Sequence, residues 1–214
     1  MDVCGVVLTS GDEAALGLLD SRPLAAHAAS ALRGSGVVGL VVVTGPPGAP
    51  PALPGAIQVE QAGSLHGSLH RVLPLLAGAD VVVLHDAHRP LAPPELVVRA
   101  VAAVRAGADA ALPVVEVTET VKQVDAGGRI VRTVPRETLV QLQTPQAVRG
   151  EVLAAAHRDC APGDPLLPAS IRVTTVPGAA DAFPVRDGRD LQLAAAVLAN
   201  REAAARPAPG PAGR

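Results

Sequence analysis

The sequence predicts a single α/β domain in which helices flank a mainly parallel sheet and a β-hairpin arm projects from it. Short aliphatic runs alternate with amphipathic runs over residues 3–117, and this alternation is typical of β-α-β units. Glycine and proline separate the runs, as they do between secondary-structure elements. The alternation breaks at residues 120–134, where two runs flank "DAGG", a sequence suited to a hairpin turn.

The strands are predicted from short runs rich in valine and leucine. Residues 80–86, "DVVVLHD", form the strongest strand, because a continuous aliphatic run of this length suits a strand covered on both faces. Residues 56–60 form the weakest one. The predicted strands are residues 3–10, 39–45, 56–60, 80–86, 110–117 and 171–178.

The helices are predicted from apolar periodicity and from their end signals. Residues 23–36 have a proline at their start and a glycine at their end, which is the usual polarity of helix signals. Residues 46–55, between two predicted strands, are interpreted as a loop because they are rich in proline, which fixes φ and lacks a backbone N–H donor. "QTPQ", at residues 143–146, is interpreted as a turn. The predicted helices are residues 23–36, 63–79, 93–108, 150–161 and 188–206.

Composition limits the classes of function. The chain has 214 residues, of which 49% are hydrophobic and 18% charged, so it can bury a sizeable core. We expect one domain over residues 1–206 and a disordered tail over 207–214. A net charge of −2 and a single aromatic residue, Phe183, argue against nucleic-acid binding.

Cysteine usage and the N-terminal sequence predict a cytoplasmic protein. Cys4 and Cys160 are too few for a disulfide framework. The first residues contain no basic segment of a signal peptide, and no apolar run approaches the ~18 residues of a membrane span.

One short segment, "HDAHRP" at residues 85–90, concentrates functional groups at the carboxyl end of the strongest strand. Ligands of open parallel sheets bind beyond such ends. Asp86 could hold Mg²⁺ there, and Arg89 could bind a phosphate with two parallel hydrogen bonds. The alternative is that Asp86 caps the following turn and Arg89 pairs with it on the surface. We expect His85 and His88 to be structural or solvated rather than metal ligands.

Several motifs, in order, resemble those of the 2-C-methyl-D-erythritol 4-phosphate cytidylyltransferases. "QTPQ" is the most specific when it follows the others at this spacing, and "GSLHGSL" at 63–69 is a weaker match. The motifs are "VVVLHDAHRPL" (81–91), "VTETVKQV" (117–124), "TVPR" (133–136), "LQTPQAV" (142–148) and "VPGAADAFPVRDGRDLQLA" (176–194).

The resemblance implies a Rossmann-like nucleotidyltransferase that joins CTP to a sugar or polyol phosphate, releases pyrophosphate and uses Mg²⁺. It also implies a homodimer formed through an arm at about residues 117–136. Asp86 would hold the metal. Acceptor binding would fall to Arg89, Thr120, Arg136 and Thr144. Nucleotide binding would fall to Leu8, Thr9, Ser10, Gly11 and Ser68.

The sequence departs from this family in the segment that should bind the triphosphate. The family has a glycine-rich loop with arginine and lysine, whereas residues 8–23 read "LTSGDEAALGLLDSRP". Asp12 and Glu13 would repel a triphosphate by a few kcal/mol, on the order of the Coulomb energy at an effective dielectric near 20. Pro184 stands where the family has a C-terminal lysine. If the chain is active, Arg22 and Arg186 would replace the missing catalytic cations.

Three functions therefore remain open at this point. The chain could be a working cytidylyltransferase with rearranged cations. It could be a non-catalytic relative that acts as a regulatory or dimer-partner protein. It could also be a nucleotidyltransferase for another sugar phosphate.

Overall fold

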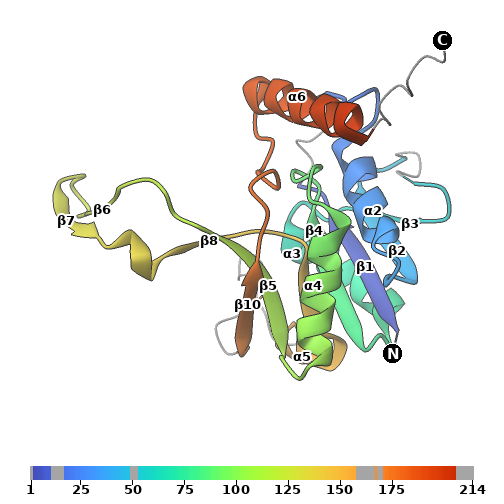
Figure 1. Cartoon of the computed structure of the whole chain (residues 1–214). Helices are drawn as coiled ribbons and strands as arrows, with labels where there is room; N and C mark the ends of the chain where they lie inside the picture. The colour runs from blue at the N-terminus through green and yellow to red at the C-terminus, as the bar shows by residue number, and fades with distance from the viewer. Residues whose placement is uncertain (1, 11–16, 49–52, 158–166, 168–170, 206–214) are drawn as a thin grey trace, which may run out of the picture.

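The computed structural model describes residues 2–10, 17–48, 53–157, 167 and 171–205 (Figure 1). Gly11, Asp12, Glu13, Cys160 and the predicted tail lie outside the described residues. Among those that are described, no helix combines the length and apolar character needed to cross a membrane.

The centre of the fold is an eight-stranded, mainly parallel sheet. Its strands follow the order β10-β5-β9-β4-β1-β2-β3, and β8 also pairs with β5. All neighbouring pairs are parallel except those of β8 and β9. The strands are β1 (Val3–Leu8), β2 (Leu40–Gly45), β3 (Ile57–Glu60), β4 (Val81–Asp86), β5 (Ala110–Glu116), β8 (Val140–Leu142), β9 (Gln146–Arg149) and β10 (Val173–Pro177). The predicted α/β fold is confirmed.

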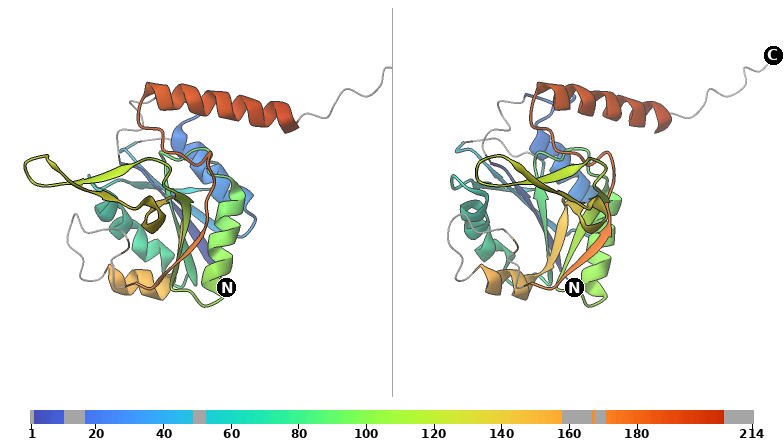
Figure 2. Two further views of the ribbon diagram at one scale, coloured as in Figure 1. Left: turned by 60° about the vertical axis from the view of Figure 1, so that its left-hand side comes forward. Right: turned by 90° about the vertical axis from the view of Figure 1, so that its left-hand side faces the viewer.

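Helices cover both faces of the sheet (Figure 2). Successive strand residues point to opposite faces. Val7 and Val83 therefore pack with α2 and α4, while Val6 and Val82 pack with α3 and α5. The helices are α2 (Leu24–Gly34), α3 (Leu65–Val72), α4 (Pro94–Arg105), α5 (Gly150–Ala156) and α6 (Gly188–Ala205), with 3₁₀ turns η1 (Leu73–Leu76) and η2 (Arg136–Thr138).

Two predicted elements differ from the structure. The helix predicted over residues 63–79 is divided into α3 and η1, because Pro74 cannot donate the next helical hydrogen bond. The turn predicted at "QTPQ" leads into β9, which lies between β4 and β5 and buries Ala147 and Val148. β9 has only four residues, which is too short for its pattern of apolar and polar residues to predict a strand.

The projecting hairpin is present as predicted. β6 (Val121–Val124) and β7 (Ile130–Val134) form a separate two-stranded sheet that stands away from the main one (Figure 1). The Asp125 carboxylate stabilises the turn by accepting hydrogen bonds from the backbone N–H groups of Gly127 and Arg129. Gly128 adopts a φ of +78°, a conformation that favours glycine.

Candidate active site at the β1–β4 edge

The candidate site lies where the chain order of the sheet reverses, between β1 and β4. From β1 the strands β2 and β3 extend to one side, while β4, β9 and β5 extend to the other. Leu8 ends β1 directly beside Asp86, which ends β4. Open α/β sheets bind their ligands outside the carboxyl ends of the strands at such a switch point.

On the β1 side, the structure brings Leu8, Thr9 and Ser10 to this edge. Leu8 is buried, and its carbonyl accepts a hydrogen bond from the backbone N–H of Ala87. Thr9 is also buried, and its backbone N–H donates to Thr44 Oγ1 at 2.9 Å. Its hydroxyl lies 2.9 Å from Gln61 Oε1, so Thr9 links the ends of three strands. Ser10 is exposed just beyond them.

Ser68, on α3, is fully buried. Its hydroxyl accepts a hydrogen bond from the backbone N–H of Ala62 at 2.9 Å. The hydroxyl therefore fixes the loop before α3, and its assignment to nucleotide binding stays a prediction.

Asp86 combines a structural contact with partial exposure. Its Oδ1 accepts a hydrogen bond from the His88 backbone N–H at 2.9 Å and lies 3.1 Å from His88 Nδ1. Its side chain is 33% exposed. Burial alone raises the pKa of Asp86, but the hydrogen bonds and charge of His88 outweigh burial, so the pKa is lowered. The carboxylate is therefore ionised at neutral pH at the opening of the site.

Arg89 is buried and holds two segments of backbone together. Its guanidinium donates to the carbonyl of Ala182 at 2.6 Å and to that of Leu142 at 3.2 Å. Burial, then the charge of Arg186, lowers the pKa of Arg89, while Asp86 raises it. The turn-capping alternative is thus seen for Asp86, but Arg89 does not pair with it on the surface. A guanidinium has five N–H donors, so further bonds remain available to Arg89.

Arg186 is carried to the same region by the C-terminal segment. The backbone N–H of Val185 donates to the carbonyl of His88 at 2.7 Å, which attaches this segment to the "HDAHRP" loop. Arg186 itself is exposed, and its backbone N–H donates to Asp190 Oδ2. A second guanidinium in the region of Asp86 and Arg89 would suit a polyanionic ligand.

Thr144 contacts the last two residues of β4. Its hydroxyl accepts a hydrogen bond from the backbone N–H of Asp86 at 3.1 Å and lies 2.8 Å from His85 Nδ1. His85 is fully buried, and burial is the main reason that its pKa is lowered to about 4. A neutral His85 is therefore part of the support of the site, as its predicted structural role requires.

Gln143 was not singled out by the sequence analysis, yet it fixes the C-terminal segment. Its amide exchanges two hydrogen bonds with the backbone of Ala179, at 2.8 and 2.9 Å. Thr44 and Gln61 were also missed. Thr44 lies in the last two residues of the predicted strand 39–45, and Gln61 directly follows the predicted strand 56–60, so their position at strand ends could have identified them.

Three predicted residues lie elsewhere in the chain. Arg22 donates to Ala26 and Ser30 of α2. Arg136 donates to the carbonyl of Thr118, and it lines a hollow of about 350 Å³ on the arm together with Thr120. Figure 1 shows the arm, with β6 and β7, standing away from β4, the strand that ends at Asp86. Within one chain, Thr120 and Arg136 are therefore not brought to Asp86.

Two further cavities, of about 380 and 310 Å³, lie at the opposite edge of the sheet around Ala79 and Glu151. Neither contains a predicted site residue. The charged groups that a phosphate-transfer site needs, an ionised carboxylate and two guanidinium groups, instead lie at the β1–β4 edge.

Comparison with known proteins identifies the family of this chain. A family model described as 2-C-methyl-D-erythritol 4-phosphate cytidylyltransferase matches residues 4–200. The protein of that name from Frankia casuarinae is 43% identical over 206 residues, covering 91% of this chain and 77% of the relative. The one from Streptomyces avermitilis is 36% identical and covers 92% and 88%.

A solved structure shows the same relationship. The crystal structure of 2-C-methyl-D-erythritol 4-phosphate cytidylyltransferase from Thermus thermophilus aligns with a TM-score of 0.78 at 30% identity, covering 92% of this chain and 98% of that one. The resemblance predicted from the motifs is thereby confirmed: this chain belongs to the 2-C-methyl-D-erythritol 4-phosphate cytidylyltransferase family.

Proposed function

We propose that this chain transfers CMP from CTP to 2-C-methyl-D-erythritol 4-phosphate and releases pyrophosphate, a step of isoprenoid biosynthesis. The observation that carries the proposal is the ionised, partly exposed Asp86 carboxylate at the switch point of a chain in this family. The reaction needs cations and a carboxylate at one place, and this edge offers both.

In the proposed reaction, a phosphate oxygen of the acceptor attacks the α-phosphorus of CTP. A new phosphorus–oxygen bond forms, and the bond from the α-phosphorus to the bridging oxygen of the β-phosphate breaks. The electron pair of that bond leaves with pyrophosphate. Charge accumulates on the transferred group and on the leaving group, so catalysis here consists of positioning and of electrostatic stabilisation.

Asp86 is the residue that would hold Mg²⁺. Magnesium keeps several waters and is commonly bound through one or two carboxylates together with substrate phosphates, which fits a single half-open carboxylate. When bound, the ion would neutralise the triphosphate and stabilise the leaving pyrophosphate. The His88 hydrogen bonds to Oδ1 fix the orientation of this carboxylate.

The cationic roles are assigned to Arg186 and Arg22. Support for Arg186 comes from its exposure and from the hydrogen bond of the adjacent Val185 to His88, and its charge contributes to the lowered pKa of Arg89. Arg22 would have to exchange its contacts with Ala26 and Ser30 for the triphosphate. Arg89 and Thr144 would bind the acceptor phosphate, with the nucleotide against Leu8, Thr9, Ser10, Gly11 and Ser68.

The arm is proposed to complete the site of a second copy in a homodimer. Its ribbon exposes large apolar side chains: Val124 is 54% exposed, Ile130 67% and Val131 60%. An isolated two-stranded ribbon is at best marginally stable in water and gains from a surface to pack on. Packing against a second copy would bury these side chains and move Thr120 and Arg136 toward the acceptor. Light scattering at micromolar concentration should give a dimer, and a monomer would contradict this arrangement.

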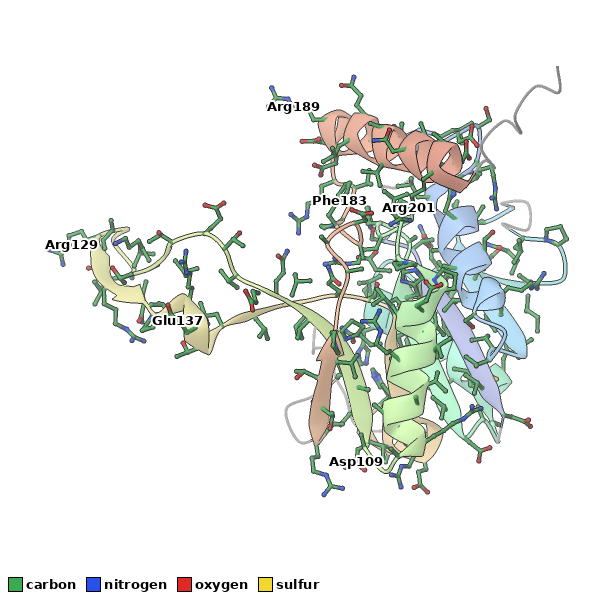
Figure 3. The ribbon with its side chains drawn as sticks, viewed as in Figure 1. Asp109, Arg129, Glu137, Phe183, Arg189 and Arg201 are labelled. Carbon is green, nitrogen blue, oxygen red and sulfur yellow. The ribbon has the colours of Figure 1, made fainter. Side chains whose placement is uncertain are left out.

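The function is tested by measuring pyrophosphate release from CTP and Mg²⁺, with and without 2-C-methyl-D-erythritol 4-phosphate. We expect release only when the acceptor is present. Asp86→Asn keeps the size of the side chain but removes its charge, so the rate should fall by a factor of about 10² or more. Asp109→Asn, at the opposite edge of the sheet (Figure 3), is the control and should keep the wild-type rate.

The outcomes separate the three functions. Release with another sugar phosphate but not with this acceptor would indicate a different nucleotidyltransferase. No release with any acceptor, from a protein that is folded by circular dichroism, would indicate the non-catalytic relative. An unchanged rate in Asp86→Asn would assign Asp86 to turn capping alone.

A further inference from the structure

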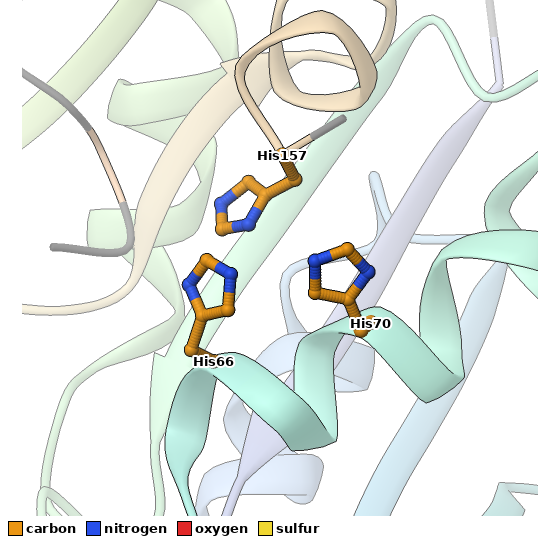
Figure 4. A group of neighbouring side chains, drawn as sticks. All are labelled: His66, His70 and His157. Carbon is orange, nitrogen blue, oxygen red and sulfur yellow. The ribbon is translucent and has the colours of Figure 1, made fainter. Parts of the chain in front are cut away.

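Three histidines from two distant segments meet on the face of the sheet that α3 and α5 cover (Figure 4). His66 and His70 lie on α3, and His157 follows the last residue of α5. Each offers a ring nitrogen, and the three nitrogens lie within 4.8 Å of one another. None of these side chains has a place in the proposed transfer reaction.

The helix brings two of these histidines together. Residues four apart lie on the same face of an α-helix, one turn above the other. His66 and His70 have this spacing, and their ring centroids are 5.0 Å apart. The ring of His157 approaches from the opposite side, 4.6 Å from that of His66. Figure 4 shows the three rings turned toward a common centre.

The ring nitrogens of His66 point to a ligand at this centre. The residue is only 4% exposed, and both of its ring nitrogens are buried without a hydrogen-bond partner among the described residues. Buried polar groups nearly always have a partner, and each exception calls for an explanation such as an ion. Stacking of the rings does not satisfy a ring nitrogen, so it does not provide that explanation.

We propose that His66, His70 and His157 form a binding site for a divalent transition metal ion of the zinc class. Neutral imidazole is a ligand of Zn²⁺, Co²⁺, Ni²⁺ and Cu²⁺ but a poor one for Mg²⁺, which prefers oxygen. The site is therefore distinct in chemistry from the Asp86 carboxylate. His70 is exposed, whereas His66 and His157 are buried. An ion can enter past His70, and a water molecule can take the fourth position on that side.

The geometry needs only a side-chain adjustment. Zn–N distances of about 2.0–2.1 Å in a tetrahedral site put ligand nitrogens roughly 3.3 Å apart. The nitrogens here lie within 4.8 Å of one another, so they must approach by up to about 1.5 Å, which ring rotation at the side-chain bonds can supply. The neighbouring Arg71 does not oppose this, because its guanidinium is directed to the carbonyls of Glu60 and Gln61.

A bound ion would join α3 to the end of α5. It would thereby connect two elements that come from distant parts of the sequence and pack on the same face of the sheet. Ser68 on α3 accepts a hydrogen bond from the backbone N–H of Ala62, and the adjacent Gln61 contacts Thr9 at the candidate site. The metal would therefore stabilise the wall of the nucleotide side, and the inference does not depend on which reaction occurs there.

The test uses full-length protein without a polyhistidine tag, stripped of metal with a chelator and then dialysed. Co²⁺ is titrated while its visible d–d absorption is recorded, and Zn²⁺ affinity is measured by competition with a chromophoric chelator. We expect one equivalent of metal, bound with micromolar affinity or better. Zn²⁺ should also raise the melting temperature in proportion to the logarithm of its free concentration once the site is saturated.

Variants locate the ion. His70→Gln alters an exposed side chain and should weaken Zn²⁺ binding at least tenfold, and His157→Gln should do the same. Arg71→Gln, on the same helix, and Asp86→Asn, at the carboxylate edge, are matched controls that should bind as wild type does. The proposal is overturned if wild type takes up no metal, if His70→Gln binds normally, or if Asp86→Asn abolishes binding.

Discussion

The buried His85 should make the stability of this protein depend on pH in a defined window. Burial lowers the pKa of His85 to about 4 in the folded chain, whereas histidine in an unfolded chain titrates near its ordinary value of about 6.5. Between these two values the unfolded state binds a proton that the folded state excludes. The free energy of unfolding is therefore fully retained above about pH 6.5 and is lost as the pH falls toward 4.

The size of the effect follows from the two pKa values. A difference of one pKa unit corresponds to about 1.4 kcal/mol, so the lowering to about 4 makes about 3 kcal/mol of stability dependent on pH. This is a large fraction of the ~5–15 kcal/mol that holds a typical domain folded. Asp86 affects stability in a different pH range. Because its pKa is lowered in the folded chain, its contribution to the free energy of unfolding is lost only as the pH falls below the usual carboxyl range.

Urea unfolding at a series of pH values from about 4.5 to 8, with chelator present, measures this dependence. His85→Asn is the informative variant, because an amide can take the place of Nδ1 beside Thr144 and cannot bind a proton in this range. It should lower the stability at all pH values but flatten its slope between pH 4.5 and 6.5. His27, whose pKa is also lowered chiefly by burial, leaves a remaining slope, and His27→Asn is the control that should keep most of the dependence.

A slope in His85→Asn equal to that of wild type would refute the reasoning. It would mean that the ring is protonated in the folded protein or that other groups control acid unfolding.

Three further predictions can be checked with the same or simpler measurements. Gly178→Ala should destabilise the fold by about 1–3 kcal/mol in urea unfolding, because a Cβ there would lie 2.4 Å from Gln143 Oε1 and 2.7 Å from the Val114 carbonyl oxygen. Gly188→Ala, where a Cβ would meet nothing within 4 Å, should be neutral. Arg89→Ala should lower the free energy of unfolding by about 2–4 kcal/mol, because two carbonyls lose their hydrogen-bond donor. It should also weaken acceptor binding. Arg89→Lys should destabilise the fold less. The wild-type protein should bind CTP with a dissociation constant in the millimolar range, which corresponds to a binding free energy of roughly −4 kcal/mol. Replacing Asp12 and Glu13 with glycine should tighten binding, as calorimetry can show, with a gain that shrinks at high salt; no gain at any salt concentration would exclude the carboxylates as the cause.

The parts of the fold that could be predicted are those encoded by local pattern. The aliphatic runs around Val82 and Val42 are long enough to identify strands, and a strand end places Asp86 without any knowledge of tertiary structure. β9 could not be found in this way, because four residues pair on both sides only once β4 and β5 exist. The burial of Arg89 likewise depends on carbonyls of Leu142 and Ala182, far away in the sequence.

The histidine cluster illustrates the same limit. The spacing of His66 and His70 on a predicted helix could have suggested a pair of ligands. His157 follows another helix, and only the packing of α3 and α5 on one face of the sheet brings it to them. Local sequence can thus propose two ligands of such a site but not the third.

The antiparallel β9 has a consequence for how the chain folds. β4 and β5 do not pair with each other, and each instead pairs with β9, so residues 146–149 close the centre of the sheet. Until those residues arrive, β4 is the aliphatic edge of a four-stranded sheet formed by β3, β2, β1 and β4. An uncovered apolar edge is a template for association with other chains. Completion of the sheet also requires contacts of high sequence separation, which slow folding. A nascent or truncated chain that ends before β9 should therefore be prone to aggregation through β4, although in the finished sheet this strand has a neighbour on each side.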